Sequence, residues 1–527
     1  MAAEIQANVP SYAKVLVIGG GPGGSYTAAA LAREGIDVVL LEAAKFPRML
    51  PSLRHFLRFI DAERKVEEHG FQKKPGAAIL FNQWKREGYT FFGISELDEI
   101  LLRHAAESGA KVYEEHKVTG LQFAEGSDHR PISATFTAPN STETRCIQFD
   151  YLVDASGRAG IMTTKYLKNR HMNETLKNIA CWAYWKGTDV YAPGTDRENS
   201  PWFEALTDES GWAWFIPLHN NTVSVGIVMD IQTSAAKKAA GSAAKAGSGG
   251  TYTLQDHYLD QFVFVPRLKK LLGGAELVID TSGQNATVKS ASDYSYTASA
   301  YSGDHFRLVG DASAFIDPFF SSGVHLAVAG GLTAAATIAA SIRQHCSEQE
   351  AALFHDHKVS VSYTRFLLTV LGAYKQIRNQ QVPVLSDINE TNFDRAFDLI
   401  RPVIQGTADA GKLTENELQK AMEFVTHLFV PTDPEMQQSV GTRLGVDFLA
   451  PGTPLLTRDE ISNLAAGDED TEWVLNQANA TKSVNDFYTG PEHLLGEVVN
   501  GLVGSTKVGC LGLVRVSEDS KSKMRRK

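Results

Sequence analysis

The first apolar run of the chain, Val15 to Ile18, follows a polar stretch and predicts a short buried strand of a parallel sheet. Ser25 to Arg33 is rich in alanine and has the pattern of a helix, which Gly35 ends. A second apolar run, Val38 to Leu41, predicts another strand. The chain therefore opens with the strand–helix–strand order of an α/β domain.

Helices alternate with short strands after this unit, and further strands predict a second sheet. The expected elements are a helix at 53–60, sheet within 71–92, a helix at 97–107, a polar hairpin loop at 137–144, and strands at 112–113, 117–123, 147–153, 179–186, 212–217, 223–229, 295–300 and 306–309. Ser234 to Gly250 consists mostly of Ala, Lys, Gly and Ser, which favours a flexible surface insertion without chemistry.

The pattern becomes helical from Leu332 onward. One apolar stripe repeats at intervals of three and four in Tyr363, Phe366, Leu367, Val370, Leu371, Tyr374 and Ile377, and Phe393, Phe397 and Ile400 follow with similar spacing. The long apolar run after Val324 is interrupted by Gly330 and Thr333, so we expect a buried helix rather than a membrane span. After about Pro451 the pattern weakens, and we expect that region to be partly mobile.

The length, charge and cysteine content of the chain exclude several classes of function. A chain of 527 residues suffices for two or three domains, and its net charge of −10 argues against a nucleic-acid-binding protein. Cys146, Cys181, Cys346 and Cys510 are scattered, without the spacing of a zinc site or a disulfide framework. This usage is typical of a reducing compartment, and the N-terminal residues lack the features of a signal peptide. We therefore expect a cytoplasmic protein without a bound metal.

Three glycines between the first strand and the first helix, Gly19, Gly21 and Gly24, occupy the positions of a G-x-G-x-x-G motif. The first permits a tight turn, the second lets the backbone approach a pyrophosphate, and the third lets helix and strand pack closely. The helix N-terminus attracts phosphates, and Glu42 stands where a carboxylate accepts hydrogen bonds from an adenosine ribose. The alternative is a purely structural glycine turn.

Two later segments complete the signature of a two-part FAD-binding fold. The strand at 147–153 ends in Asp154-Ala-Ser-Gly-Arg158, a common closing element of that fold, although taken alone it also fits an ordinary turn. Asp311 follows the strand at 306–309, where a carboxylate in such folds faces the ribityl or pyrophosphate region. No second G-x-G-x-x-G follows a strand, so electrons come from transient NAD(P)H binding or from a partner reductase.

Several longer strings extend this signature. They are residues 19–35, 46–48 and 49–60, the pair Lys73-Lys74, Trp212–Pro217 and Asp317–Leu326. In these strings the chain resembles the fungal flavin-dependent halogenases that chlorinate phenolic, largely polyketide-derived aromatics, over a span from Val15 to beyond Gln405. The resemblance implies an α/β (α+β) fold with a two-part Rossmann-like FAD-binding domain. We expect this domain over 1–340, with an inserted antiparallel substrate sheet at about 70–305, and a helical C-terminal region over 341–527.

Trp212-x-Trp214-x-Ile216-Pro217 looks like the W-x-W-x-I-P motif that distinguishes halogenases from flavin hydroxylases. Two large aromatic side chains can fill the space beside the flavin and keep the substrate away from the peroxide. The alternative is a buried strand with two core tryptophans.

Ser321-Ser322-Gly323-Val324 precedes a helix, and its backbone N–H groups can form a small anion-binding nest. By resemblance, chloride binds at the N–H groups of Ser322 and Gly323, and Val324 touches the flavin ring. The alternative is a helix cap by one of the two serines. Phe320 stands where tryptophan-type halogenases carry a glutamate, which fits phenols, whose hydroxyl already activates the ring.

Lys74 is the candidate catalytic lysine, with Lys73 as the alternative. In the family, flavin hydroperoxide converts chloride into hypochlorous acid, which travels along a tunnel to a lysine that holds it beside the aromatic ring. A buried lysine suits this role because desolvation lowers its pKa and favours the nucleophilic amine. The other interpretation is a pair of solvated lysines at a strand end.

The sequence departs from the family in two places. The loop that family members carry between Arg48 and Met49 is absent, and the segment from Thr90 to Leu97 is short. The predicted function is a halogenase that uses reduced FAD, O2 and chloride, with a phenolic substrate and a separate flavin reductase. Two alternatives stay open: an FAD-dependent aromatic monooxygenase of the same fold, and an inactive relative, because both shortened segments adjoin the cofactor and substrate in family members.

Overall fold

Strand β1 (Tyr12–Ile18) lies at the centre of a parallel sheet, between β2 (Val38–Leu41) and β8 (Thr144–Asp154). Its apolar residues from Val15 onward are buried, since both faces of the sheet are covered. The parallel strands, in spatial order, are β18 (Phe306–Leu308), β8, β1, β2 and β5 (Lys111–Tyr113). β18 joins this sheet although it comes late in the chain, so a distant segment completes the opening domain.

The computed structural model describes residues 8–44, 54–68, 77–81, 90–92, 99–126, 129–139, 141, 143–195, 197–218, 220–247, 249–279, 287–292, 294–320, 322–381, 432, 434–445, 449, 453–454, 456–484 and 491–516.

Antiparallel strands extend the parallel sheet at its margins. β17 (Ser302–Gly303) pairs with β18, and β7 (Pro131–Thr137) pairs with both β6 (Lys117–Phe123) and β8. The predicted hairpin loop at 137–144 is confirmed as the connection between β7 and β8.

Helix α1 (Pro22–Arg33) packs closely on α8 (Gly323–Ile342) beside this sheet. A Cβ atom on Gly23 would lie 2.5 Å from Cγ1 of Val309 and 2.9 Å from the carbonyl oxygen of Ala327, so the contact requires a glycine. α8 is long and apolar enough to cross a membrane, but 89% of its most apolar window is buried inside the protein. The predicted buried helix is therefore confirmed.

A second, mixed sheet contains the predicted strands at 179–186, 212–217 and 223–229. Its strands, in spatial order, are β14 (Glu276–Leu277), β10 (Asn178–Lys186), β13 (Val223–Asp230), β12 (Gly211–Pro217), β11 (Trp202–Ala205), β3 (Ala77–Leu80) and β4 (Thr90–Phe92), and β15 (Lys289–Ser292) also pairs with β10. The pairs are antiparallel except for β3 and β11, which are parallel. A tight turn cannot join two parallel strands, so β3 and β11 do not form a hairpin. A long crossover connection separates them in the chain.

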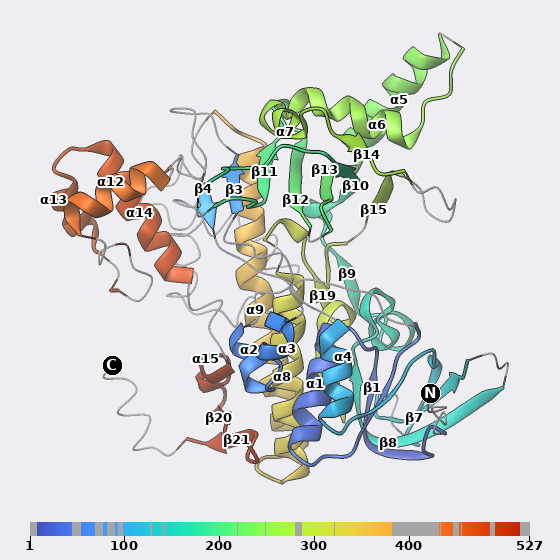
Figure 1. Ribbon diagram of the computed structural model, residues 1–527. Helices are drawn as coiled ribbons and strands as arrows, with labels where there is room; N and C mark the ends of the chain where they lie inside the picture. Colours follow the sequence, from blue (N-terminus) through green and yellow to red (C-terminus); the bar gives the residue numbers. More distant parts are fainter. Residues whose placement is uncertain are drawn as a thin grey trace.

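The segment expected to be a flexible insertion forms helix α5 (Ile231–Ala246) instead. The Asp230 carboxylate caps its N-terminus by accepting from the backbone N–H groups of Gln232 and Thr233, each at 3.0 Å. Alanine and lysine are strong helix formers, and this propensity outweighs the low complexity of the segment. α5 lies at the outer end of the second sheet with α6 (Leu254–Asp260) and α7 (Pro266–Leu272) (Figure 1).

Helix α9 (Glu348–Ile377) contacts both sheets, at β17 and β18 on one side and at β12 on the other. Its predicted apolar stripe is confirmed: Tyr363, Phe366, Leu367, Val370, Tyr374 and Ile377 are buried, and Leu371 is partly buried. The expected continuation at Phe393, Phe397 and Ile400 lies outside the described residues.

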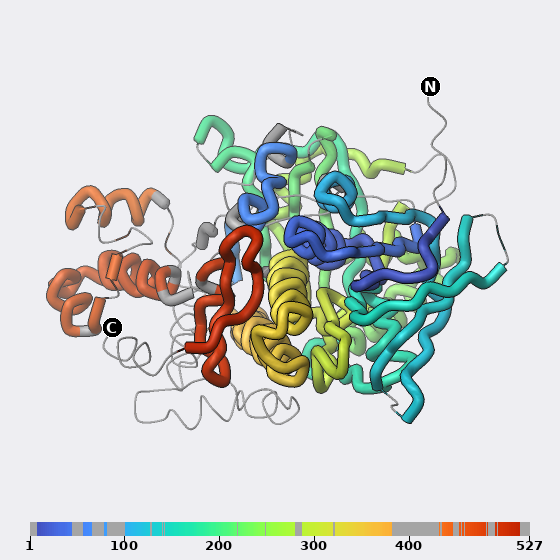
Figure 2. Tube along the Cα trace, turned by 90° about the horizontal axis from the view of Figure 1, so that it is seen from below, coloured from blue at the N-terminus to red at the C-terminus, as the bar shows by residue number. Residues whose placement is uncertain are grey.

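The weakly patterned region after Pro451 contains helices and a hairpin among its described residues, and its expected partial mobility stays a prediction. α13 (Arg458–Ala465) begins with a capping box between Thr457 and Glu460, and a C-terminal hairpin packs against α8 (Figure 2). The remaining elements are α2 (Arg54–Phe59), α3 (Glu63–Glu68), α4 (Glu99–Glu107), α12 (Pro434–Leu444), α14 (Glu469–Val484), α15 (Pro491–Gly496), the hairpin β20 (Leu502–Ser505) and β21 (Gly512–Arg515), and a small sheet of β19 (Ala314–Phe315), β16 (Tyr296–Ala298) and β9 (Arg170–Met172).

Candidate active site

A cavity of about 570 Å³ connects the glycine loop of the first sheet with the tryptophan strand of the second. Its lining residues come from the β1–α1 loop, the ends of β8 and β18, strands β11 to β13, and the segment leading into α8. They are Gly21, Pro22, Gly23, Gly24, Ala155, Gly157, Phe203, Trp212, Trp214, Ile216, Ser224, Val309, Gly310, Asp311, Phe315, Pro318, Gly323, Val324 and Ala327. The tertiary structure thus brings together motifs that lie up to three hundred residues apart in the sequence.

The three glycines of the loop differ in what surrounds them. Gly19 has a φ of +99°, which other residues rarely adopt, and a Cβ atom there would lie 2.2 Å from the carbonyl oxygen of Ala155. A Cβ atom on Gly24 would lie 2.0 Å from the carbonyl oxygen of Gly19. At Gly21 no described atom lies within 4 Å of such a Cβ, so its backbone borders open space in the cavity. Gly19 and Gly24 match the predicted turn and close packing, and the approach of Gly21 to a pyrophosphate stays a prediction.

Glu42 lies directly after β2, as expected. Its carboxylate accepts from the backbone N–H of Gly20 at 2.6 Å and of Ala44 at 2.7 Å, which fixes it beside the glycine loop. Glu42 does not line the large cavity, so its contact with a ribose stays a prediction.

Asp311 lies in a short turn, Gly310–Ala312, and lines the cavity. Burial raises the pKa of its carboxyl group to about 6, although the Arg158 and Arg170 guanidinium groups act in the opposite direction. The backbone of Asp311 is held by the Tyr296 hydroxyl, which donates to its carbonyl oxygen at 2.8 Å. The backbone of the turn is therefore fixed beside the cavity that Asp311 lines.

The predicted anion site lies at the N-terminus of α8. Gly323 and Val324 line the cavity, and the Ser322 hydroxyl is buried without a hydrogen-bond partner among the described residues. Ser322 makes no side-chain cap to the helix, so the capping alternative is wrong for this serine. Ser321 lies outside the described residues.

The two tryptophans lie side by side on β12, with ring centroids 5.8 Å apart, and both line the cavity. Trp212 is almost fully buried and its indole N–H donates to the Tyr374 hydroxyl at 2.8 Å. The Trp214 indole N–H donates to the Ser224 hydroxyl at 3.1 Å. Ile216 also lines the cavity, whereas Pro217 does not. Trp212 is thus a core residue and a cavity wall at once, which the two sequence interpretations had treated as alternatives.

Three polar residues form a hydrogen-bond network with Trp212, and the sequence did not indicate a role for them. They are Asp317, Tyr374 and Asn178. Asp317 is fully buried and accepts from the Tyr374 hydroxyl at 2.6 Å and from the Asn178 side-chain amide at 3.2 Å. Burial raises the pKa of the Asp317 carboxyl group to about 6. The sequence pattern placed Tyr374 only in the apolar stripe of α9, and nothing in that pattern indicated that its hydroxyl makes a hydrogen bond in the core. An aspartate among apolar residues in the Asp317–Leu326 string was the one available clue.

Lys73 and Lys74 lie outside the described residues, as does the Arg48–Met49 junction; of Thr90 to Leu97 only 90–92 are described. β3 begins three residues after Lys74 and pairs with β11, whose Phe203 lines the cavity. The role of the lysine stays a prediction.

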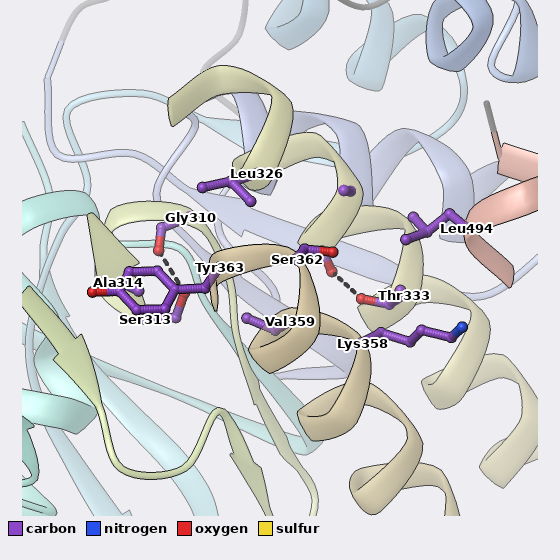
Figure 3. A pocket seen from close by; sticks show the side chains of 12 residues that line it. Gly310, Ser313, Ala314, Leu326, Thr333, Lys358, Val359, Ser362, Tyr363 and Leu494 are labelled. Carbon is purple, nitrogen blue, oxygen red and sulfur yellow. Dashed lines mark hydrogen bonds between the residues drawn. The ribbon is translucent and has the colours of Figure 1, made fainter. Parts of the chain in front are cut away.

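A second cavity of about 20 Å³ borders Gly310 and Ser313 at the Asp311 turn and lies between α8 and α9 (Figure 3). The Ser313 hydroxyl donates to the carbonyl oxygen of Gly310 at 2.6 Å, and the Thr333 hydroxyl donates to that of Gly330 at 2.9 Å. Lys358, which lines it, pairs with Glu497 at 2.6 Å. The space suits about one water molecule, and it supports the turn rather than a reaction.

FAD fits the described residues of the large cavity. Open space borders Gly21 at the N-terminus of α1, where free backbone N–H groups favour a pyrophosphate. Asp311 offers a buried acceptor in the same cavity, and Val324 offers an apolar contact. The lining of the cavity as a whole is mostly apolar, which suits a planar ring system.

Two family models match this chain. The one described as tryptophan halogenase matches residues 91–419, and the one described as NAD(P)-binding Rossmann-like domain matches residues 17–49, which hold most of the β1–α1–β2 unit.

Whole-chain relatives agree. The flavin-dependent halogenase armH4 of Armillaria mellea is 55% identical over 537 residues, with 96% of this chain and 99% of the relative covered. The sulochrin halogenase gedL of Aspergillus terreus is 44% identical over 542 residues, covering 96% and 94%. Among solved structures, the myxobacterial chondrochloren halogenase CndH matches with a TM-score of 0.60 and 23% identity over 79% of this chain and 97% of that chain, and this likeness concerns the fold alone.

Proposed function

The chain belongs to the flavin-dependent halogenases, and we propose that it installs chlorine on an electron-rich phenolic compound by means of Lys74. Membership of the family brings the requirement for reduced FAD, O2 and a halide, with a small-molecule substrate and a flavin reductase. It also favours the halogenase over the aromatic monooxygenase of the same fold.

The single observation that supports this proposal best is the shared cavity. The glycine loop, Asp311, the N-terminus of α8 and the W-x-W-x-I-P strand all border one space of about 570 Å³. When bound there, reduced FAD supplies with O2 the oxidising power that turns a halide into an electrophilic halogen. Trp212 and Trp214 line this cavity from β12, which supports the proposal that their rings keep the substrate away from the flavin.

The N-terminus of α8 is the proposed halide site. An anion is favoured there because the first N–H groups of this 20-residue helix have no helical partners and carry the positive end of the dipole. The unpartnered Ser322 hydroxyl adds a buried donor at the same end, next to Gly323 and Val324.

Lys74 is the proposed carrier of the oxidised halogen. Its neutral amine attacks the chlorine atom of hypochlorous acid, the O–Cl bond breaks, and the oxygen leaves as water with a proton from the amine. The ring carbon of the phenol then takes chlorine from nitrogen as the N–Cl bond breaks, and the proton that the ring loses restores the amine. β3 leads from this lysine into the sheet that forms the aromatic wall, which supports a position on the substrate side.

A phenolic substrate is supported by the aromatic lining contributed by Phe203, Trp214 and Phe315. One relative is named a sulochrin halogenase. The four cysteines, all described and all free, support a location in the reducing cytoplasm.

The test is a product assay with FAD, a flavin reductase, NADH, chloride and a panel of phenolic polyketides. The expected product carries the chlorine isotope pattern in its mass spectrum. Lys74→Ala is expected to abolish this product while FAD binding persists, with Lys73→Ala as the matched control. A product that has gained only oxygen would support the monooxygenase instead, and no turnover despite bound FAD would support an inactive relative. Competition between chloride and bromide establishes the halide preference.

A further inference from the structure

One hydroxyl group joins the tryptophan wall to the segment that leads into the halide site. Trp212 donates its indole N–H to the Tyr374 hydroxyl at 2.8 Å, and that hydroxyl donates to Oδ2 of Asp317 at 2.6 Å. We propose that Tyr374 and Asp317 are positioning residues that hold the Trp212 indole and the turn at Asp317–Phe319 in one arrangement, so that affinity at the halide site, which follows this turn in the chain, depends on them. This inference rests on the proposed halide site at Ser322 and Gly323.

The Asp317 carboxylate ties together elements that are distant in the sequence. Tyr374 comes from α9, and Asn178, which donates to Oδ2 at 3.2 Å, comes from β10. The other oxygen, Oδ1, accepts from the backbone N–H of Phe319 at 3.2 Å and so closes the first turn of the segment that ends at Gly323.

The same segment also touches the indole directly. The Phe319 ring packs edge-on against Trp212, with centroids 5.4 Å apart and an interplanar angle of 75°. Trp212, Tyr374 and Asp317 are 1%, 4% and 0% exposed, so water cannot replace a lost hydrogen bond among them. A change at the Tyr374 hydroxyl is therefore passed to both the wall and the turn.

The chain contains a matched control. On the same sheet, Trp185 donates to the Tyr258 hydroxyl at 3.0 Å, and this hydroxyl donates to the carbonyl oxygen of Val225 at 2.9 Å. Trp185 and Tyr258 belong to a separate core cluster and do not line the large cavity. Tyr258→Phe thus removes the same kind of hydroxyl bridge without touching the site.

The geometry is tested first, by 19F NMR of the full-length protein labelled with 5-fluorotryptophan. Of the seven tryptophan signals, those of Trp212 and Trp185 are assigned by their loss in Trp212→Phe and Trp185→Phe. Tyr374→Phe is expected to move the Trp212 signal and leave that of Trp185, and Tyr258→Phe to do the reverse. A Trp212 signal unchanged by Tyr374→Phe would overturn the proposal.

The function of the network is tested by the chloride concentration that half-saturates halogenation. Tyr374→Phe and Asp317→Ala are expected to raise it about tenfold, the equivalent of one lost hydrogen bond. Asp317→Asn keeps the acceptor for Tyr374 but turns an NH2 group toward the Phe319 N–H, so it should restore chloride affinity only in part. Equal chloride dependence in Tyr374→Phe and Tyr258→Phe would overturn the proposal and leave the network a purely structural one. If the wild type forms no halogenated product, the proposed function fails, and the NMR comparison then decides the positioning role by itself.

Discussion

A Cβ atom on Gly226 would lie 2.2 Å from Cζ2 of Trp214, so the indole of the second motif tryptophan lies over the glycine of the neighbouring strand. The two residues are direct partners in the β12–β13 pairing. Two strand positions further back on β13, Ser224 accepts from the indole nitrogen. The orientation of Trp214 is therefore set by β13 as much as by its own strand.

Gly226→Ala is expected to displace the Trp214 indole from its position over residue 226 and move it into the cavity. We expect halogenation to fall about tenfold in a protein that still folds, measured as kcat together with the melting temperature. Gly303→Ala is the control, because a Cβ atom there would lie 2.4 Å from Cε1 of Phe306, outside the large cavity. Equal losses of activity in the two variants would show that the position of the Trp214 indole over Gly226 has no specific role in halogenation.

Two substitutions in the glycine loop should separate an effect on stability from an effect on cofactor binding. Gly24→Ala introduces a Cβ atom 2.0 Å from the carbonyl oxygen of Gly19, and the free energy of unfolding should fall by about 2 kcal/mol. Gly21→Ala meets no described atom within 4 Å, so stability should be retained. FAD affinity should nevertheless fall about tenfold, because the methyl group occupies the approach of the pyrophosphate. Urea unfolding of the apoprotein and a flavin fluorescence titration measure the two effects. Unchanged FAD affinity in Gly21→Ala would contradict the assignment.

Glu42 and Glu34 make similar hydrogen bonds, but replacing each by glutamine should affect FAD binding differently. Glu42→Gln is expected to weaken FAD binding about tenfold, because an amide offers one acceptor fewer to the ribose and to the backbone. Glu34 also accepts from two backbone N–H groups, of Gly509 and Leu511, and pairs with Arg343. Glu34→Gln should lower the melting temperature and leave FAD affinity intact. A loss of FAD affinity in both variants would contradict a specific role for Glu42.

Asp317 should make stability depend on pH. Burial raises its pKa from the ordinary 3.8 to about 6, so between these values the folded protein binds a proton that the unfolded chain does not. Stability must therefore fall as the pH rises through this window and level off above it. Relative to Asp317→Asn, the wild type should lose about 1 kcal/mol between pH 5 and pH 7.5. Urea unfolding of both proteins across this range measures the difference, and parallel profiles would contradict the prediction.

Local pattern was sufficient for most of the opening domain. The strands at Val15–Ile18 and Val38–Leu41 and the helix after Gly24 were predicted correctly, because apolar runs, alanine content and glycine positions act over a few residues. The same approach failed at α5, where low complexity was given more weight than helix propensity. After Pro451 the pattern was too weak to predict the elements, because α13 begins at a capping box and the C-terminal hairpin is held by packing against α8.

The sequence by itself determined the chemistry that the protein carries: a glycine loop for a dinucleotide, a tryptophan strand, a serine–glycine turn before a long apolar helix, and a lysine near a strand. Each of these is a short string whose meaning lies in its own residue types. Only the tertiary structure decided that Gly21, Trp214 and Val324 border one cavity, and that Tyr374 bridges Trp212 to Asp317. Such contacts join residues separated by dozens to hundreds of positions, and they exist because α9 and the two sheets pack together, which no local pattern specifies.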